Sequence, residues 1–270
     1  MQVWPSGLGQ GIAKAVLKKG GNVVVTARDR SRVLHFEEEY PDRALAVSLE
    51  LALPDARKKA VEAAVSRFGQ VDILVNNASH GYRAAIEESE PEKIRQLFEE
   101  DFFGPMELVR LVLPRMREKK KGLVINVTSI GAVRGALGNG YYSAAKGALE
   151  LATEALQKEV ESFGIRTMLV EPGAMRTGFY GSRMEGTGTR LTAYDGIAEA
   201  YRRELVRDQH DQLGDPDTCG EILVETALDE HAPFRLLLGS DAVRAAKQTL
   251  QDRLEELEKW KKTSIQTDFS

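Results

Sequence analysis

The amino-acid sequence predicts a doubly wound α/β fold, in which helices cover both faces of a parallel sheet. Short apolar runs rich in β-branched residues alternate with segments of helical period along the chain. These runs are almost continuously apolar, which is typical of parallel strands buried on both faces. The length of 270 residues suits one large domain, or such a domain with a small appendage. In folds of this kind, ligands bind beyond the carboxyl ends of the strands.

Six segments are predicted to form the strands. Each is a short run of valine, leucine and isoleucine, the composition that favours extended structure. In chain order they are Asn22–Arg28, Arg43–Leu51, Val71–Ala78, Gly122–Ser129, Ile165–Pro172 and Arg235–Gly239.

Helical periodicity fills the intervals between these strands. It is clearest in Pro54–Phe68 and in Ala144–Gly164, where Gly164 is a candidate C-cap. In the second segment one apolar face is expected to pack on the sheet. That face is formed by Ala148, Leu151, Ala152, Ala155 and Leu156.

Two segments fall outside the alternation. The glycine-rich stretch Thr177–Gly196 is predicted to be a mobile loop that borders the substrate. Residues 1–240 are expected to form the main domain, and residues 241–270 a charged helix and tail. This helix has Leu250, Leu254 and Leu257 on one stripe, which favours packing on its own domain, with a dimer contact as the alternative.

Composition and charge exclude several classes of protein. The formal net charge is −4, with acidic and basic residues interspersed, so no nucleic-acid partner is expected. The single cysteine, Cys219, rules out an intramolecular disulfide and fits a reducing compartment. The sequence has no membrane-length apolar stretch, no signal-peptide pattern and no histidine spacing typical of a metal site. We therefore expect a soluble, cytoplasmic protein without a metal or a membrane partner.

The motif "YYSAAKGALE" supplies a candidate acid–base pair. Tyr142 and Lys146 are four residues apart at the start of a predicted helix, so their side chains share one face. The reference pKa of a tyrosine is about 10, and a neighbouring ammonium favours its phenolate. Taken alone, the same spacing also fits an exposed pair on a helix surface.

Polar residues end three of the predicted strands. Ser129 follows one strand, thirteen residues before Tyr142; Asn76–Ser79 and Glu171–Gly173 end two others. Because parallel strands end at the same edge of a sheet, these residues are expected to converge on one crevice.

In their order and spacing, these motifs resemble those of the short-chain dehydrogenase/reductase family. The matching segments are "SGLGQGIA", "VDILVNNA", the strand-end Ser129, "YSAAK" and "VEPGAMRT". The resemblance extends from Gly7 to beyond Gly239, nearly the whole chain. It implies a Rossmann-type fold and hydride transfer between a nicotinamide cofactor and a carbonyl or alcohol.

The resemblance also implies roles for individual residues. Tyr142 would be the acid–base catalyst, and Ser129 would orient and polarise the substrate oxygen. Lys146 would lower the pKa of the tyrosine and hold the nicotinamide ribose. The cofactor would be lined near its middle by Asn76 and Ala78, and at its nicotinamide end by Pro172, Gly173 and Thr177.

The end of the first complete strand indicates which cofactor is used. An NAD enzyme of this fold has an acidic residue there, which binds the ribose 2′-hydroxyl. Here the aligned residue is Ala27, and Arg28 follows it. A guanidinium suits the 2′-phosphate of NADP, so we expect NADP. Glu50 is expected near the adenine, where the family usually has a shorter aspartate.

The opening of the chain departs from the family. Gly7 and Gly9 align with the second and third glycines of the cofactor turn, and Val3 with the first. The central strand that precedes this turn in the family is then absent, so a gap or a re-paired sheet is expected. The helix that begins near Leu8 would still offer its amides to a phosphate. Either the chain as given starts too late, which the retained site residues favour, or the protein has lost the strand.

Two further departures lie close to the catalytic residues. Asp101 stands where the family has an asparagine that holds a water chain leading to the lysine. Its carboxylate could pair with Lys146, and its charge opposes formation of the tyrosinate. We therefore expect Asp101 to contribute to catalysis and to raise the pH of half-maximal activity. Ser79 replaces a glycine that commonly follows Asn-Asn-Ala.

The function predicted from the sequence is an NADP-dependent oxidoreductase acting on a carbonyl or secondary alcohol of a small molecule. Phe179, Tyr180 and Met184 in the loop favour an apolar or ring-containing substrate. The alternative is a catalytically impaired relative that acts as a binding or scaffold protein. A homodimer or homotetramer fits the resemblance as well.

Overall fold

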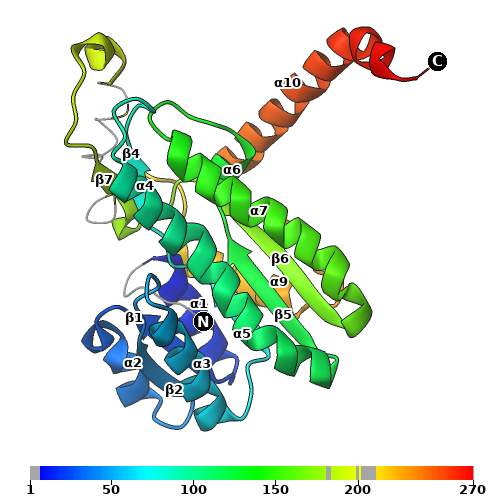
Figure 1. Ribbon diagram of the computed structural model, residues 1–270. Helices are drawn as coiled ribbons and strands as arrows, with labels where there is room; N and C mark the ends of the chain where they lie inside the picture. Colours follow the sequence, from blue (N-terminus) through cyan, green and yellow to red (C-terminus); the bar gives the residue numbers. More distant parts are fainter. Residues whose placement is uncertain (1–6, 181–183, 199–200, 202–210, 270) are drawn as a thin grey trace.

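The computed structural model describes residues 7–180, 184–198, 201 and 211–269, and they form an α/β fold of parallel strands between two layers of helices (Figure 1). Helices α3 (Pro54–Phe68), α5 (Gly104–Lys119) and α7 (Gly140–Val160) cover one face of the strands, and α1 (Leu8–Lys18) and α9 (Pro216–Leu228) cover the other. This confirms the Rossmann-type doubly wound fold.

The strands follow the predicted segments closely. The segment at Ile165–Pro172 is β6 to the residue, and the other five predicted strands differ only at their ends. Two short strands, β4 and β7, were not expected from the sequence. In chain order the strands are β1 (Val23–Ala27), β2 (Ala44–Ser48), β3 (Ile73–Asn76), β4 (Gly81–Arg83), β5 (Gly122–Val127), β6 (Ile165–Pro172), β7 (Met184–Gly186) and β8 (Arg235–Leu238).

The helices begin and end where the residue types predict. Helix α3 has a proline at its first position, and Gly69 ends it in the left-handed conformation with φ of 80°. Gly164, the predicted C-cap, adopts φ of 71°. The α-helices are α1 (Leu8–Lys18), α2 (Leu34–Glu39), α3 (Pro54–Phe68), α4 (Pro91–Phe98), α5 (Gly104–Lys119), α6 (Ile130–Val133), α7 (Gly140–Val160), α9 (Pro216–Leu228) and α10 (Ser240–Ser264).

The sheet is divided into separate ladders. Strands β3, β5, β6 and β8 form one parallel ladder in the order β3-β5-β6-β8, and among the described residues β1 pairs only with β2. Among the described residues no strand pairs with both β1 and β3, so a gap separates the two ladders there; residues 1–6, which bear on the expected loss of a strand, lie outside the described part. Val3 lies outside the described residues.

Helix α1 lies across this gap. One set of its side chains, which includes Ile12 and Ala15, packs in the core beneath β3, β5 and β6. Another set, Ala13 and Leu17, packs against β1 and β2. The same helix therefore contributes to the hydrophobic cores of both ladders.

The face of α7 that packs on the sheet differs from the predicted one. Leu151 is 69% exposed and Ala155 is exposed as well, whereas Leu149 and Thr153 are buried. Apolar residues occupy both sides of this helix, so the periodicity of the sequence did not determine which side faces the sheet. Of the five residues predicted for the core face, Leu156 is buried.

The segment Thr177–Gly196 is more ordered than the predicted loop. It contains β7, which pairs in parallel with β4 in the register Gly81 to Met184. Met184 is buried there against Gly81, where a Cβ would overlap the methionine side chain. The placement of the tip residues 181–183 and of the Tyr180 side chain lies outside the described part.

The C-terminal helix packs on the domain only at its start. Ala242 and Ala246 are buried, and the Arg253 guanidinium donates a 2.5 Å hydrogen bond to the carbonyl oxygen of Val133 in α6. Every described residue from 250 to 269 is exposed, and α10 projects away from the rest of the molecule (Figure 1). The expectation that the whole segment packs on its own domain is therefore wrong beyond its first turns.

Candidate active site

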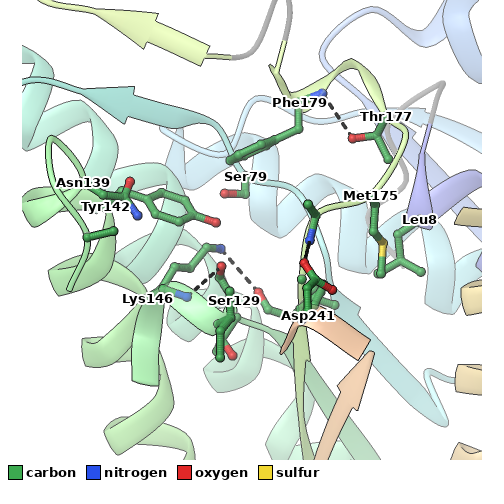
Figure 2. Close-up of a pocket in the computed structure, with 18 of the residues that line it drawn as sticks. Leu8, Ser79, Ser129, Asn139, Tyr142, Lys146, Met175, Thr177, Phe179 and Asp241 are labelled. Atoms are coloured by element: carbon green, nitrogen blue, oxygen red, sulfur yellow. Dashed lines mark hydrogen bonds between the residues drawn. The ribbon is translucent and has the colours of Figure 1, made fainter. Parts of the chain in front are cut away.

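A cavity of about 490 Å³ opens where β5 and β6 end, as the fold class predicts (Figure 2). Its walls come from α1, the segments after β3, β5 and β6, and α7, which lie far apart in the sequence. The predicted site residues that line it are Gly7, Leu8, Ser129, Tyr142, Lys146, Pro172, Gly173 and Thr177.

Ser129 and Tyr142 approach each other within this cavity. Ser129 is the N-cap of α6, and its Oγ accepts a 3.0 Å hydrogen bond from the amide of Gly131. A Cβ placed on Gly131 would lie 3.3 Å from Cε1 of Tyr142 and 3.4 Å from Oγ of Ser129. The two side chains therefore converge beside a residue that leaves them space.

Lys146 is one helical turn after Tyr142 and is almost fully buried, with 2% of its surface exposed. Its Nζ donates a 3.3 Å hydrogen bond to the carbonyl oxygen of Val127 and lies 3.5 Å from Oδ2 of Asp101. The same Nζ is 6.0 Å from the centre of the Tyr142 ring. The ammonium is thus held between the end of β5 and a carboxylate, on the side of the tyrosine ring.

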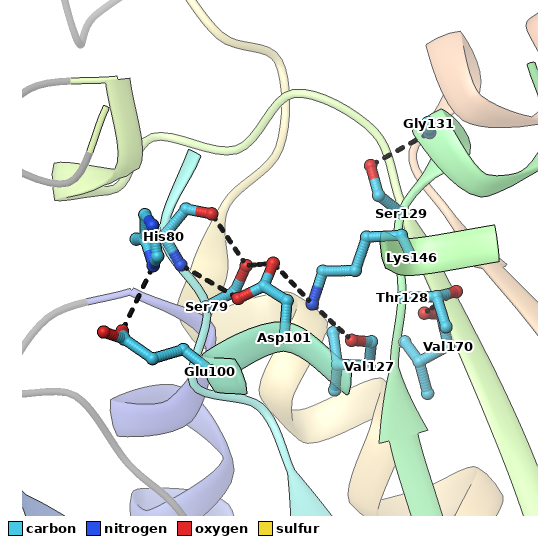
Figure 3. Close-up of polar contacts among 10 residues, drawn as sticks. All are labelled: Ser79, His80, Glu100, Asp101, Val127, Thr128, Ser129, Gly131, Lys146 and Val170. Atoms are coloured by element: carbon cyan, nitrogen blue, oxygen red, sulfur yellow. Dashed lines mark hydrogen bonds and ion pairs between the residues drawn. The ribbon is translucent and has the colours of Figure 1, made fainter. Parts of the chain in front are cut away.

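Asp101 is positioned by a single π-helical turn, Glu99–Phe103, between α4 and α5. Such turns often occur at functional sites. The side chain is fully buried, and Oδ2 accepts a 2.7 Å hydrogen bond from the hydroxyl of Ser79 (Figure 3). Oδ1 accepts a 3.3 Å hydrogen bond from the amide of His80. Asp101 therefore lies within hydrogen-bonding or ion-pair distance of both Ser79 and Lys146.

The pKa of Tyr142 is raised well above its ordinary value. Burial is the main cause, and the negative charge of Asp101 adds to it. The hydroxyl of Ser129, the charge of Arg83 and the hydroxyl of Ser79 lower this pKa, in the opposite direction. The ammonium of Lys146, which the sequence was expected to place beside Tyr142, also lies 3.5 Å from Oδ2 of Asp101, the residue whose charge raises the pKa of the tyrosine.

His80 and Glu100 form a second polar pair beside Asp101. Nδ1 of His80 lies 3.1 Å from Oε2 of Glu100, and both side chains are largely buried. Burial lowers the pKa of His80, but the hydrogen bond to Glu100 and the charge of Asp101 outweigh burial, so this pKa is raised. The pair fixes the segment that follows β3, and with it Ser79.

The start of α1 and the segment after β6 meet at one end of the cavity. Gly7 is the N-cap of α1 and has φ of 90°, a conformation that glycine adopts without strain. A Cβ at Gly7 would lie 2.8 Å from Cγ2 of Thr177. Oγ1 of Thr177 accepts a 3.2 Å hydrogen bond from the amide of Phe179. This close approach brings the two predicted cofactor segments together.

A second, small cavity of about 20 Å³ lies at the ends of β1 and β2. Arg28, Glu50 and Ala78, which were all predicted to contact the cofactor, line it. Ser79 lines both cavities, so the two lie next to each other. The residues predicted for the two ends of the cofactor therefore line neighbouring cavities.

Two predicted cofactor residues line neither cavity. Gly9 is buried within α1, and the Asn76 amide donates a 2.8 Å hydrogen bond to Oδ1 of Asn126 inside the sheet. The neighbouring Asn77 lines the main cavity instead. Strand alternation, which turns successive side chains to opposite faces, is the signal that could have separated the two asparagines. Further lining residues without an assigned role in the sequence are Ser79, Arg83, Asn139, Met175, Tyr201 and Asp241.

Two kinds of feature are absent from the described part of the chain. Its histidines, cysteines and acidic residues form no group of three that could hold a metal ion. Its helices include none with the length and hydropathy needed to cross a membrane.

Comparison with known proteins identifies relatives over nearly the whole chain. A family model described as short chain dehydrogenase matches residues 5–187. The chain is 30% identical over 260 residues to the oxidoreductase BOA17 of Botryotinia fuckeliana, covering 96% of this chain and 94% of that protein. It is 33% identical to a 3-ketodihydrosphingosine reductase of Bacteroides thetaiotaomicron, with 87% and 84% covered.

Solved structures agree with this comparison. A short-chain dehydrogenase from Streptomyces avermitilis superposes with a TM-score of 0.91 at 36% identity, covering 99% of this chain and 96% of that one. A 3-ketoacyl-(acyl-carrier-protein) reductase from Brucella melitensis, solved with NADH, has a TM-score of 0.72 at 28% identity, covering 87% and 93%. A metagenomic short-chain oxidoreductase with NADP has a TM-score of 0.65 and covers 86% and 91%, and at 22% identity it shows the shared fold.

Proposed function

Because the chain belongs to the short-chain dehydrogenase/reductase family of oxidoreductases, we propose that it transfers a hydride between NADP and a carbonyl or secondary alcohol of a small molecule. The observation that carries this proposal is the convergence of Ser129, Tyr142 and Lys146 on one cavity. The same cavity is lined by the start of α1 and by the segment after β6. The family's motifs predict that the cofactor binds at these two segments.

The residues present fit a dinucleotide. The first amides of α1 have no partner within the helix and point out of its N-terminus, which suits a phosphate. Gly7 permits close approach because it has no Cβ, and the cavity continues past Pro172 and Gly173. We propose that Gly7 and Leu8 hold the pyrophosphate and that Pro172, Gly173 and Thr177 contact the nicotinamide end. When bound, the nicotinamide supplies the hydride acceptor or donor.

The protein's own groups would handle the proton. Tyr142 would take the proton of a substrate hydroxyl during oxidation and return it during reduction. Ser129 would donate a hydrogen bond to the substrate oxygen as negative charge develops on it. Since burial and Asp101 raise the pKa of Tyr142, the tyrosinate needs a further cation nearby, and the oxidised nicotinamide is one. The amine of Lys146, one turn away, is placed to hold the adjoining ribose.

The preference for NADP rests on the small cavity at the end of β1. Arg28 lines it, and Ala27 occupies the position where an acidic residue would bind a free 2′-hydroxyl. A planar guanidinium matches a 2′-phosphate. Glu50 and Glu100 line the same cavity, and we propose that they accept hydrogen bonds from the adenosine rather than contact the phosphate.

The substrate is proposed to be small and largely apolar, and ring-containing molecules fit. Leu137, Phe179 and Tyr201 line the cavity beyond Tyr142. The ring of Phe179 lies 5.8 Å from that of Tyr142, measured between centroids, so an apolar body would lie next to the reacting oxygen. Met184, which the sequence also suggested, packs against Gly81 instead.

The first experiment is thermal unfolding of the protein with saturating NADPH, with saturating NADH and without cofactor. A ligand at a hundred times its Kd stabilises a protein by about 2.7 kcal/mol, which is a shift of several degrees in Tm. A shift with NADPH alone supports the proposal and justifies a screen of carbonyl compounds. An equal shift with NADH would contradict NADP preference while keeping the dehydrogenase assignment.

One observation favours a second candidate, a catalytically silent binding protein. The ladder β1-β2 and the ladder that begins with β3 are not joined by a strand in the described residues, and the predicted cofactor site spans both. If neither cofactor shifts the Tm of a folded protein, and Tyr142→Phe leaves its stability and partners unchanged, this candidate replaces the enzyme.

A further inference from the structure

Arg83 brings a fixed positive charge into the wall of the main cavity, and neither the sequence motifs nor the proposed function gives it a role. It lines the cavity, and 8% of its surface is exposed. A guanidinium is not deprotonated in proteins, so Arg83 keeps its charge when it is buried. A buried cation in the wall of a cavity favours ligands of the opposite charge.

The alternation of β4 places Arg83 on the side of the cavity proposed for the substrate. Arg83 and Gly81 are alternate residues of this strand, so their side-chain positions share one face. A Cβ on Gly81 would lie 3.0 Å from Cζ of Phe179. The ring of Phe179 lies 5.8 Å from that of Tyr142, measured between centroids (Figure 2). Arg83 therefore lies on the face of β4 that borders Phe179, next to the proposed position of the substrate body.

An electrostatic effect agrees with this placement. The charge of Arg83 lowers the pKa of Tyr142. Because interactions between charges weaken with distance, the guanidinium lies near enough to the reacting hydroxyl for one small molecule to contact both.

A second arginine lines the same cavity, from the segment that follows α6. Arg134 is exposed, so it lies where the cavity meets the solvent. Its segment is joined to the residue after β4, because the amide of Ala84 donates a 3.0 Å hydrogen bond to the carbonyl oxygen of Gly138. Arg83 and Arg134 therefore belong to adjoining walls, and their combined field attracts anions from solution.

The remaining charged groups of the lining belong to the catalytic and cofactor side. The described residues that line the cavity include four with charged side chains, namely Arg83, Arg134, Lys146 and Asp241. Lys146 lies 3.5 Å from Oδ2 of Asp101. Oδ2 of Asp241 accepts a 2.8 Å hydrogen bond from the amide of Ala174, in the segment proposed to contact the nicotinamide end. Within the described lining, the substrate side therefore carries two positive charges and no negative one.

A carboxylate is the anion that suits this position. A planar guanidinium can donate two parallel hydrogen bonds to a carboxylate. A carboxylate is also smaller than a phosphate or a sulfate, and a cavity of about 490 Å³ must hold the nicotinamide end together with the substrate. Leu137, Phe179 and Tyr201 supply apolar surface in the same lining. The lining thus fits a small molecule with an apolar body and one carboxylate.

We propose that the substrate is an oxo acid or a hydroxy acid whose carboxylate is bound by Arg83. Its apolar body lies against Phe179, and its carbonyl or hydroxyl oxygen lies at Ser129 and Tyr142. Arg134 attracts the anion to the cavity. The carboxylate serves for recognition and takes no part in hydride transfer. This inference rests on the proposed function and narrows its substrate class.

The first test compares phenylacetate with phenylacetamide, two probes that share a carbon skeleton and differ in charge. Both are titrated, by ligand-observed NMR, into the protein saturated with NADP. We expect phenylacetate to bind roughly tenfold more tightly, the effect of hydrogen bonds to a charged group. Equal Kd values, or no binding of either probe, would overturn the proposal. Tighter binding of phenyl phosphate than of phenylacetate would overturn it in favour of a phosphate.

The second test removes the charge of Arg83. Arg83→Met keeps the apolar stem, and it should raise the Kd of phenylacetate roughly tenfold to hundredfold while that of phenylacetamide stays the same. Arg83→Lys keeps the charge without the planar fork, so an intermediate Kd is expected. Arg110→Met is the control, because Arg110 is an exposed arginine of α5 that does not line the cavity.

Two results with these variants would contradict the assignment of Arg83. One is an unchanged Kd of phenylacetate in Arg83→Met, and the other is a rise in the Kd of NADPH in place of that of phenylacetate. If Arg83→Met does not fold, Arg83→Lys and the comparison of the two probes on the wild type decide the outcome.

Cofactor binding is measured separately, so that this inference and the proposed function can be told apart. A Tm shift with NADPH, together with equal Kd values for the two probes, would overturn the carboxylate site and keep the proposed function. If neither NADPH nor NADH shifts the Tm, the proposed function fails, and the substrate assignment fails with it.

Discussion

The hydroxyl of Ser79 donates a 2.7 Å hydrogen bond to Oδ2 of Asp101, and its interaction with Tyr142 lowers the pKa of that tyrosine. Two residues that depart from the family's usual pattern therefore interact with each other and with the proposed catalytic tyrosine. The two act on that tyrosine in opposite directions, since the carboxylate raises its pKa and the hydroxyl lowers it. Paired substitutions can separate these effects.

Asp101→Asn should move the pH dependence of alcohol oxidation to lower pH. Removal of the negative charge lowers the pKa of Tyr142, so the tyrosinate forms at lower pH. We expect the midpoint of the profile of kcat/KM to fall by roughly one pH unit, the order of shift that a nearby charge produces. An unchanged midpoint, with cofactor affinity preserved, would mean that Asp101 does not influence the tyrosine.

Ser79→Ala should shift the same profile to higher pH. The variant loses the hydroxyl whose interaction with Tyr142 lowers the pKa of that tyrosine, and an interaction of this kind with a charged group contributes about 1.5–3 kcal/mol. We expect at least a tenfold lower kcat/KM near neutral pH. Ser79→Thr keeps the hydroxyl and is the control; if it loses as much activity as Ser79→Ala, the effect comes from packing.

Arg28→Ala should weaken the binding of NADPH and leave that of NADH nearly unchanged. Loss of charge-assisted hydrogen bonds to a 2′-phosphate corresponds to roughly a tenfold to hundredfold rise in Kd. Titration by cofactor fluorescence measures both constants. Arg32→Ala is the matched control, because Arg32 is an exposed arginine of the same segment that lines neither cavity. Equal losses for the two cofactors would place Arg28 outside the phosphate site.

Glu171→Gln should make the free energy of unfolding depend less on pH between pH 5 and pH 8. Burial and the charge of Glu150 raise the pKa of Glu171 to about 7, from 4.5 in the unfolded chain. Between these values the folded state holds the proton more tightly, so the free energy of unfolding falls as the pH rises. Between pH 5 and pH 8 the free energy of unfolding of the wild type is expected to fall by roughly 1–3 kcal/mol more than that of the variant.

Urea unfolding at the two pH values measures this difference. Glu154→Gln is the control, because the hydrogen bond from Arg235 lowers the pKa of Glu154 and its contribution changes only at more acidic pH. A wild type whose stability is the same at pH 5 and pH 8 would contradict the raised pKa of Glu171.

Gly220→Ala should destabilise the contact between α1 and α9. A Cβ on Gly220 would lie 2.5 Å from the backbone nitrogen of Ile12, and neither helix backbone can move without disturbing the core. Overpacking of this kind costs about 1–3 kcal/mol or more. Gly147→Ala in α7, where the nearest atom is 3.9 Å away, should instead stabilise by up to about 1 kcal/mol. Equal Tm values for the two variants would show that α1 and α9 are less tightly packed.

Much of this fold could be predicted from the sequence because its strands are short apolar runs bounded by turns. The strand Ile165–Pro172 and the helix Pro54–Phe68 were predicted to the residue. The face of α7 was not, because apolar residues such as Leu151 occur on its exposed side. Strands β4 and β7 were missed because three residues are too few to show an alternating pattern.

The candidate site was predictable where residue type and place in an element coincide: Ser129 follows the end of β5, and Tyr142 lies in the first turn of α7, one turn before Lys146. Strand alternation separates Asn76 from Asn77, but it does not say which of the two lines the cavity; in the structure Asn77 lines it and the Asn76 amide donates to Asn126. Nor could the sequence show that Ser79 contacts Asp101, since 21 residues separate them and a π-helical turn orients the carboxylate. Tertiary packing, not local pattern, decides these cases.

The divided sheet predicts that the two parts of the molecule unfold locally and independently. The ladder of β1 and β2 shares no strand with the ladder of β3, β5, β6 and β8 in the described chain, so side-chain packing, through α1 on one face and α3 on the other, links the two. Two ladders without common backbone hydrogen bonds can unfold as separate cooperative units, and amide exchange should be faster in β1 than in β5. Arg28 belongs to one unit and Tyr142 to the other. A dinucleotide bound across both units would couple their local unfolding. Its affinity should therefore depend on the stability of the contact between the two units.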